Sequence, residues 1–259
     1  MIQRVCPRHS PTTRVDQRRA VVGTPPMDTG FMVLRRMGKS LIGGRGAQWL
    51  RELNERHAWS HNDYFHSWIL ANLPDRRGRA LDMGCGRGGL VRVLAPHFEH
   101  VVGADADAEM RRIAQATSAA VDNVSITDRQ LDSWADDSID LVTMVAVLHH
   151  LDIDDALLHV ERILAPNGRL LVVGLAPPRS AQDLVWDSVS IVTNPLIGFI
   201  HRPWPSPVTA PPPPFPVKDP VLSFDEIGHM VERRLPGAVM RHRIGFRHTI
   251  EWTKPRSSS

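Results

Sequence analysis

An acidic residue followed by alternating glycines is the feature of this sequence best suited to bind a ligand. The segment Asp82-Met83-Gly84-Cys85-Gly86-Arg87-Gly88-Gly89 follows the short apolar run 79–81 and leads into an apolar helical stretch at 90–94. Glycine at every second position lets the backbone turn tightly and approach a ligand without an intervening side chain. A helix beginning there offers N–H groups and partial positive charge to a carboxylate or phosphate. The segment therefore predicts a nucleotide-type cofactor site on an open α/β sheet.

The glycines fit two cofactor patterns. Residues 84–89 match G-x-G-x-x-G, the dinucleotide pattern, whereas residues 82–88 match D-x-G-x-G-x-G. With either cofactor, an acidic residue about 20 positions later is expected after a second strand, where it binds a ribose diol. Asp105 fills that place. The glycine motif and Asp105 thus leave both cofactors open.

Later segments resemble one family. D-x-G-x-G-x-G is the first motif of class I S-adenosylmethionine-dependent methyltransferases, and four further segments resemble that family in order. They are the adenine-binding stretch at 128–142, the end of the fourth strand at 145–151, the helix–turn–strand at 161–173, and the closing strand pair at 235–255. The resemblance covers roughly residues 57–255, with a gap near 177–222, and is to a small-molecule branch. It implies S-adenosyl-L-methionine as cofactor and methyl transfer to a small organic acceptor.

Two alternatives stay open at this stage. Short-chain NAD-dependent dehydrogenases use a Tyr and a Lys four residues apart, downstream of the glycine loop. The single tyrosine here, Tyr64, lies upstream, and the three lysines are Lys39, Lys218 and Lys254, so that pair cannot form. Other hydride-transfer arrangements remain, as does a regulatory protein that binds the cofactor without turnover.

The resemblance implies the cofactor-binding residues one by one. Asp82 would hold the methionyl ammonium, Asp105 the two ribose hydroxyls, and Asp128 the adenine amino group. The other implied contacts are Gly84, Cys85 and Gly86 at the methionyl part, Ala106 and Arg129 at the adenine, and Val145 at the end of the fourth strand. The competing interpretation of Asp82 is that it only caps the glycine turn, and that of Asp105 is that it caps the following helix, although Asp107 is better placed for that cap. Asp132 competes with Asp128 for the adenine contact.

Catalysis requires few residues, because a sulfonium is already an activated methyl donor and the protein mainly aligns the reactants. A general base is needed only if the acceptor arrives protonated. His149 and His150 are the candidates, and packed, hydrogen-bonded histidines are the alternative. Cys85 is expected to serve as a small residue rather than a nucleophile. We expect no metal site, because the carboxylates near His150 at 152–155 suit a helix cap better.

From residue 79 on, apolar strands alternate with amphipathic helices, as in a doubly wound α/β sheet. Together with the resemblance, this predicts a Rossmann-like sheet of seven strands, mostly parallel, with an antiparallel pair at the C-terminal end. The expected strands are 79–83, 99–104, 123–127, 139–145, 168–174, 238–244 and 247–253. The expected helices are 47–56, 68–73, 88–96, 107–119, 153–165, 181–193 and 223–234, the last opened by a capping box at Ser223.

The domain plan follows from length and composition. Residues 1–30 lack periodicity and are expected to form a disordered basic arm, and 31–259 a single methyltransferase domain. Within it we expect N-terminal cap helices at about 47–73 and a variable lid region at about 177–222. The lid contains four consecutive prolines at 211–214, which favour extended polyproline geometry.

Charge and cysteine content bear on partners and compartment. The net charge of +3 conceals a basic first part, with eleven Arg and Lys in residues 1–56, but the first 30 positions hold no aromatic residue for base stacking. The position of the Pro-Pro-Tyr group of adenine-amino DNA methylases reads Val-Ala-Val at 145–147. We therefore expect no nucleic-acid or membrane partner, and a homodimer is compatible with the sequence. Two cysteines provide no disulfide framework, so a cytoplasmic location is expected.

Overall fold

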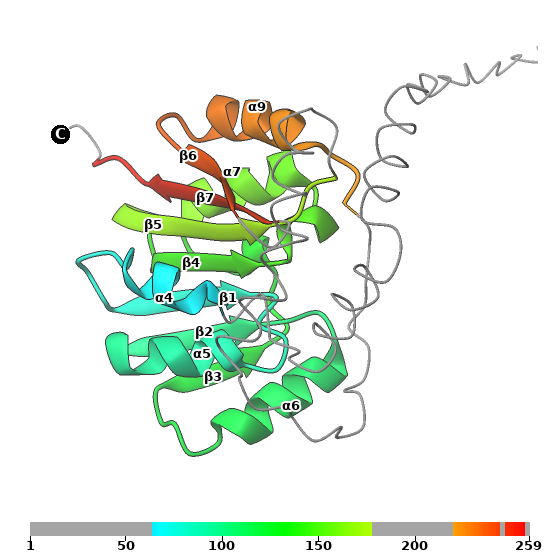
Figure 1. Cartoon of the computed structure of the whole chain (residues 1–259). Coiled ribbons are helices and arrows are strands. Elements are labelled where there is room, and N and C mark those ends of the chain that lie inside the picture. Colours follow the sequence, from blue (N-terminus) through cyan, green and yellow to red (C-terminus); the bar gives the residue numbers. More distant parts are fainter. Residues whose placement is uncertain (1–63, 178–219, 244–246, 257–259) are drawn as a thin grey trace, which may run out of the picture. The chain divides into compact units, whose positions relative to one another are not determined.

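The computed structural model describes residues 64–177, 220–243 and 247–256, which form a seven-stranded sheet with helices on both faces (Figure 1). The sheet order is β3-β2-β1-β4-β5-β7-β6. The strands β1 to β5 are parallel, and β7 is antiparallel to both β5 and β6. Their bounds are β1 (Arg79–Met83), β2 (His100–Ala104), β3 (Val124–Thr127), β4 (Ile139–Val145), β5 (Leu164–Gly174), β6 (Val239–Arg243) and β7 (Arg247–Thr253). The predicted doubly wound fold is confirmed.

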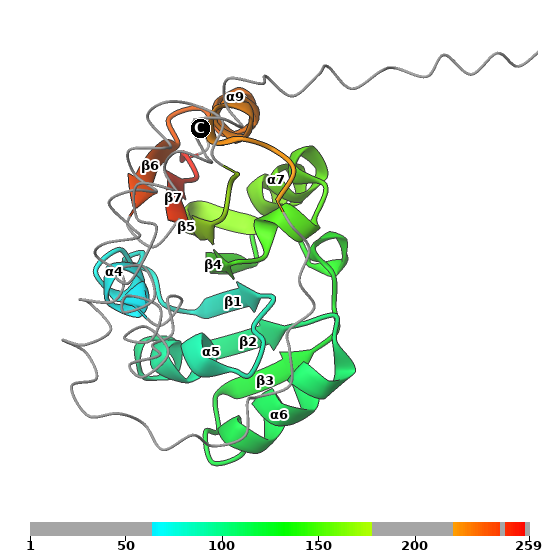
Figure 2. The same cartoon turned by 45° about the vertical axis from the view of Figure 1, so that its right-hand side comes forward.

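Helices cover the two faces separately, and Figure 2 shows α4 and α7 on opposite sides of the sheet. The helices are α4 (His66–Leu70), α5 (Gly89–Leu94), α6 (Ala108–Ser118), α7 (Ile153–Ile163) and α9 (Phe224–Arg234). Short 3-10 turns follow at η1 (Ala95–His97), η2 (Leu131–Ser133) and η3 (Leu148–His150). This alternation brings the ends of β1, β2 and β4 to one edge, the edge where open α/β sheets bind ligands.

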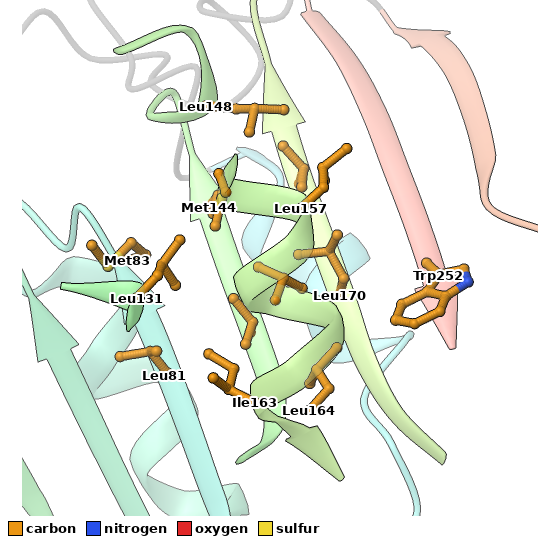
Figure 3. Close-up of a cluster of buried hydrophobic side chains, with 14 of the residues drawn as sticks. Leu81, Met83, Leu131, Met144, Leu148, Leu157, Ile163, Leu164, Leu170 and Trp252 are labelled. Carbon is orange, nitrogen blue, oxygen red and sulfur yellow. The ribbon is translucent and has the colours of Figure 1, made fainter. Parts of the chain in front are cut away.

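Each face has its own apolar core. One core packs α7, α9 and η2 against the sheet, with Leu157, Ile163 and Leu170 fully buried (Figure 3). The other packs α4 and α5 against the opposite face, around Ile69 and Val91. Central parallel strands covered on both faces read as continuous apolar runs. This explains why β4 is buried along six of its seven residues.

The caps of three helices were readable from sequence. Asp107 accepts hydrogen bonds from the second and third N–H groups of α6, and Asp152 accepts one from Asp155 at the start of α7. Ser223 and Glu226 form the predicted capping box of α9, each side chain accepting from the other residue's backbone N–H. Such side chains satisfy N–H groups that have no partner within the helix.

Some boundaries differ from expectation. β5 begins at Leu164 rather than 168, because the chain pairs with β4 again through an irregularity in register between Ile139 and Leu141. α4 ends at Leu70, three residues earlier than predicted. The predicted helices 47–56 and 181–193, the arm and most of the lid lie outside the described residues. Among the residues that are described, no helix is long and apolar enough to cross a membrane.

Two neighbouring leucines on α7 test the core assignment. Leu157 is 0% exposed and Leu158 is 45% exposed. We expect Leu157→Ala to lower the free energy of unfolding by about 2–5 kcal/mol, because it removes buried methyl groups and leaves a cavity. Leu158→Ala, the matched control, should change it by less than about 0.5 kcal/mol. Urea unfolding of both variants measures the difference, and equal losses would contradict this packing.

Candidate active site

The glycine loop turns through left-handed backbone at every second residue. The φ angles are +72° at Gly84, +52° at Gly86 and +75° at Gly88, a region that side chains rarely adopt. A Cβ atom on Gly84 would also lie 2.1 Å from Val147 Cγ2. The N–H groups of Gly84 and Cys85 both donate to the Ala104 carbonyl at the end of β2, at 2.6 and 3.0 Å. The loop is thus anchored at the carboxyl edge between β1 and β2.

Asp105 holds this loop in place. Its Oδ2 accepts a hydrogen bond from the Gly86 N–H at 2.8 Å, and its Oδ1 accepts one from the Asp107 N–H at 2.9 Å. Each carboxylate oxygen can accept more than one hydrogen bond, so both oxygens retain capacity for a ligand donor. The helix-capping role considered for Asp105 belongs instead to Asp107.

Asp82 lies near the carboxyl end of β1, an inner strand of the sheet, and is 3% exposed. The pKa of its carboxyl is raised to about 7, mainly by burial. The charge of Asp105 contributes to the rise, and the hydroxyl of Thr143, which donates to Asp82 Oδ1 at 2.7 Å, opposes it. Thr143 was not predicted as a site residue. Its signal in the sequence was a single hydroxyl within the apolar run 139–145, on the strand that pairs with β1.

Cys85 is buried within the loop. Burial raises the pKa of its thiol far above the ordinary value, and the neighbouring carboxylates of Asp82 and Asp105 raise it further. The thiolate is the nucleophilic form of cysteine. The group is therefore inert at neutral pH, in line with its interpretation as a small residue in the turn.

The predicted adenine end is held by two arginines. Arg111 donates to the backbone carbonyls of Asp105 and Ala106, both at 2.9 Å. The guanidinium of Arg129 lies over the Trp134 ring, 4.0 Å from its centroid, and bonds to Ser133. The side chain of Arg129 is therefore engaged within its own loop, which leaves its backbone for any contact with adenine.

A cavity of about 160 Å³ lies beside this loop, between η2 and the start of α7. Met83, Leu131 and Leu151 supply apolar walls. Its other lining residues are Gln130, Asp132, Asp152, Asp155, Ala156 and His159. Asp132 is thus on the cavity side, whereas Asp128 is not among its lining residues.

The two predicted catalytic histidines lie at the end of β4, on η3 rather than on the strand itself. The ring centroids of His149 and His150 are 4.1 Å apart. Between Val145 and this turn, Ala146 has φ +58°, a strained conformation for a residue with a Cβ. Such strain gathers at functional sites, and here it redirects the chain at the sheet edge beside Gly84.

The acidic residues near His150 have structural partners. Asp152 caps α7, and Asp154 forms ion pairs with Arg233 and Arg234 of α9. Within residues 64–177, 220–243 and 247–256, no group of three or more His, Cys, Asp or Glu is arranged to hold a metal ion.

Comparison with known proteins points to one activity. Residues 81–172, which contain the glycine loop and Asp105, match a methyltransferase domain family. An uncharacterized methyltransferase of Mycobacterium tuberculosis is 28% identical over 204 residues, 76% of this chain and 98% of that protein.

Solved structures share the fold. A SAM-dependent methyltransferase from Aquifex aeolicus has a TM-score of 0.51 at 15% identity, over 80% of this chain and 98% of its own. Geranyl diphosphate C-methyltransferase from Streptomyces coelicolor A3(2), solved with Mg²⁺, geranyl-S-thiolodiphosphate and S-adenosyl-L-homocysteine, has a TM-score of 0.52 at 14% identity, over 74% and 76% of the two chains.

The buried carboxyl of Asp82 makes stability depend on pH. Because its folded pKa, about 7, lies above the ordinary value of 3.8, its stabilising contribution is complete below pH 3.8 and is lost as the pH rises to about 7. Asp82→Asn cannot ionise, so we expect it to raise the free energy of unfolding at pH 8 by roughly 2–5 kcal/mol and to change it little at pH 4. Urea unfolding at both pH values measures this, and a gain independent of pH would contradict the assignment.

Proposed function

We propose that this chain, a class I S-adenosylmethionine-dependent methyltransferase, transfers the methyl group to a small organic acceptor by in-line displacement. The observation that carries the proposal is the pair of carboxylates at neighbouring strand ends, Asp82 and Asp105, on either side of a glycine loop that Asp105 itself fixes. Such a loop leaves the backbone open to the methionyl part and a carboxylate open to the ribose.

The cofactor residues proposed are those the sequence indicated. Asp82 would bind the ammonium group, with Thr143 holding the carboxylate in place from β4. The backbone of Gly84, Cys85 and Gly86 would face the methionyl chain. At the other end, Asp105 would bind the ribose hydroxyls, and Ala106, Asp128, Val145 and the backbone of Arg129 would surround the adenine.

The chemistry supplied by the bound cofactor is an electrophilic methyl group on a sulfonium. The protein's part is to align the acceptor with it and exclude water, which contributes roughly 7–11 kcal/mol in well-oriented reactions. His149 and His150, on η3 after β4, would receive a proton when the acceptor carries one. The lid at about 177–222 is proposed to choose the acceptor, within one domain spanning 31–259, and we place the reaction in the cytoplasm.

Calorimetry together with a product assay separates this function from its alternatives. We expect the full chain to bind S-adenosylmethionine and not NAD. When it is incubated with a metabolite extract and S-adenosylmethionine labelled in the methyl group, we expect a labelled methylated product. Cofactor binding without any labelled product across a broad panel would favour a regulatory protein instead. Binding of NAD in place of the sulfonium would overturn the proposal.

Asp105 provides the sharpest test of the ribose site. We expect Asp105→Ala to weaken S-adenosylmethionine binding by about 1–3 kcal/mol, because the ribose hydroxyls and the Gly86 N–H lose their acceptor. The matched control is Asp122→Ala, at an exposed position before β3, and it should leave the affinity unchanged. Calorimetry on variants shown to be folded gives the comparison, and an unaltered affinity for Asp105→Ala would remove the ribose assignment.

A further inference from the structure

A second histidine site lies one strand beyond β4. His248 is the second residue of β7 and pairs directly with Gly174, the last residue of β5. Gly174 therefore places His248 at the carboxyl edge of the sheet, next to the end of β4 from which η3 and His149 follow. This is the side of the edge opposite to β2 and Asp105.

The imidazole of His248 is buried, and one of its two nitrogen atoms is unsatisfied. The residue is 2% exposed, and its Nε2 has no hydrogen-bond partner among the described residues. Nearly all buried polar atoms in folded proteins are paired, so an exception at a ligand-binding edge calls for an explanation. A hydrogen-bonding group on a bound molecule provides one.

The neighbouring strand is shaped around this ring. A Cβ atom added to Gly174 would lie 2.2 Å from His248 Nε2 and 2.5 Å from its Cε1. No positive φ requires glycine at 174, so the reason for glycine is space for the imidazole. Position 174 thus keeps Nε2 against the end of β5.

The surroundings of His248 disfavour positive charge. Burial is the main cause that lowers its pKa to about 3, and the nearby charges of His242, Arg247 and His149 contribute to that lowering, so the ring is neutral at physiological pH. On its other side the Phe224 ring, stacked on His242 at 3.6 Å, meets His248 edge-on at 5.9 Å. Arg247, which is cationic at neutral pH, directly precedes His248 in β7, so its charge disfavours a cationic amine placed here and has no such effect on a neutral hydroxyl.

We propose that His248 binds the acceptor by a hydrogen bond through Nε2, beside His149, and thereby selects a hydroxyl-bearing acceptor over an ammonium. This inference rests on the proposed function and names the acceptor class for it. Phe224 then provides an apolar wall for the body of the acceptor. From the sequence alone, His248 is only a histidine near the start of the last expected strand, which is a weak signal.

The experiment uses the full chain saturated with S-adenosyl-L-homocysteine and a panel of alcohols and phenols with matched amines, including 4-ethylbenzyl alcohol and 4-ethylbenzylamine. Ring ¹⁵N resonances of the histidines report binding, and label transfer from S-adenosylmethionine reports methylation. We expect hydroxyl compounds to shift the His248 resonance and to bind at least about tenfold more tightly than their amines, the ratio that one buried hydrogen bond gives.

Variants separate a hydrogen-bonding role of His248 from a role in packing. His248→Leu should weaken hydroxyl binding about tenfold, whereas His248→Gln, which keeps a polar atom near Nε2, should stay within about threefold of the wild type. Gly174→Ala should resemble His248→Leu, since the added methyl displaces the ring. His100→Gln, at an exposed position at the start of β2, is the matched control.

Tighter binding of amines, an unmoved His248 resonance with every hydroxyl compound, or full hydroxyl binding by His248→Leu would each overturn the inference. If the leucine variant does not fold, the wild-type resonances and His248→Gln decide. Calorimetry distinguishes a failure of this inference from a failure of the proposed function. If the chain still binds S-adenosylmethionine when any of these results is obtained, only the role of His248 is wrong. If the wild type did not bind S-adenosylmethionine, the proposed function itself would be wrong.

Discussion

The bond from the Gly86 N–H to the Asp105 carboxylate is the contact on which the whole site depends. It joins a loop after β1 to the residue after β2, and so fixes the distance between two ligand-binding segments. A glycine-rich loop is otherwise costly to order, because glycine loses more backbone freedom than any other residue. The carboxylate and the Ala104 carbonyl together hold three successive N–H groups, those of residues 84 to 86. These three bonds constrain the backbone of the loop in one conformation.

The arrangement of the site lowers the stability of the fold at Asp82. A carboxylate in a nearly sealed position is unfavourable when charged, and the single hydroxyl of Thr143 offsets only part of that. Ala146 adds backbone strain two residues before η3. Both features lie at the carboxyl edge, while the apolar cores below them are regular. Stability from the cores therefore offsets local instability at the site.

Much of this was predictable from sequence because it depends on local rules. Alternating glycines predicted the tight turn after β1, and the capping box predicted the start of α9. The alternation of strands and helices predicted a mostly parallel sheet, since crossovers between parallel strands follow regular rules. Sequence resemblance also placed Asp82 and Asp105 at neighbouring strand ends.

What could not be predicted depends on contacts between distant segments. Thr143 and Asp82 are 61 residues apart and meet only because β4 pairs with β1. His248 and Gly174 meet through an antiparallel register that no local pattern sets. The direction of the Arg129 side chain was likewise decided by Trp134, an aromatic face five residues further on. In each case the sequence shows the residue type but not the residue that its side chain contacts.

The placement of β7 between β5 and β6 determines the order in which the sheet can be completed (Figure 1). Among the described strands β6 pairs with β7 alone, although it precedes β7 in the chain. As the chain emerges from the ribosome, β6 has no docking position on the sheet until the residues after it have been made. The first five strands can assemble earlier, so the outer edge of β5 stays open as an unprotected strand edge until the hairpin docks as one unit.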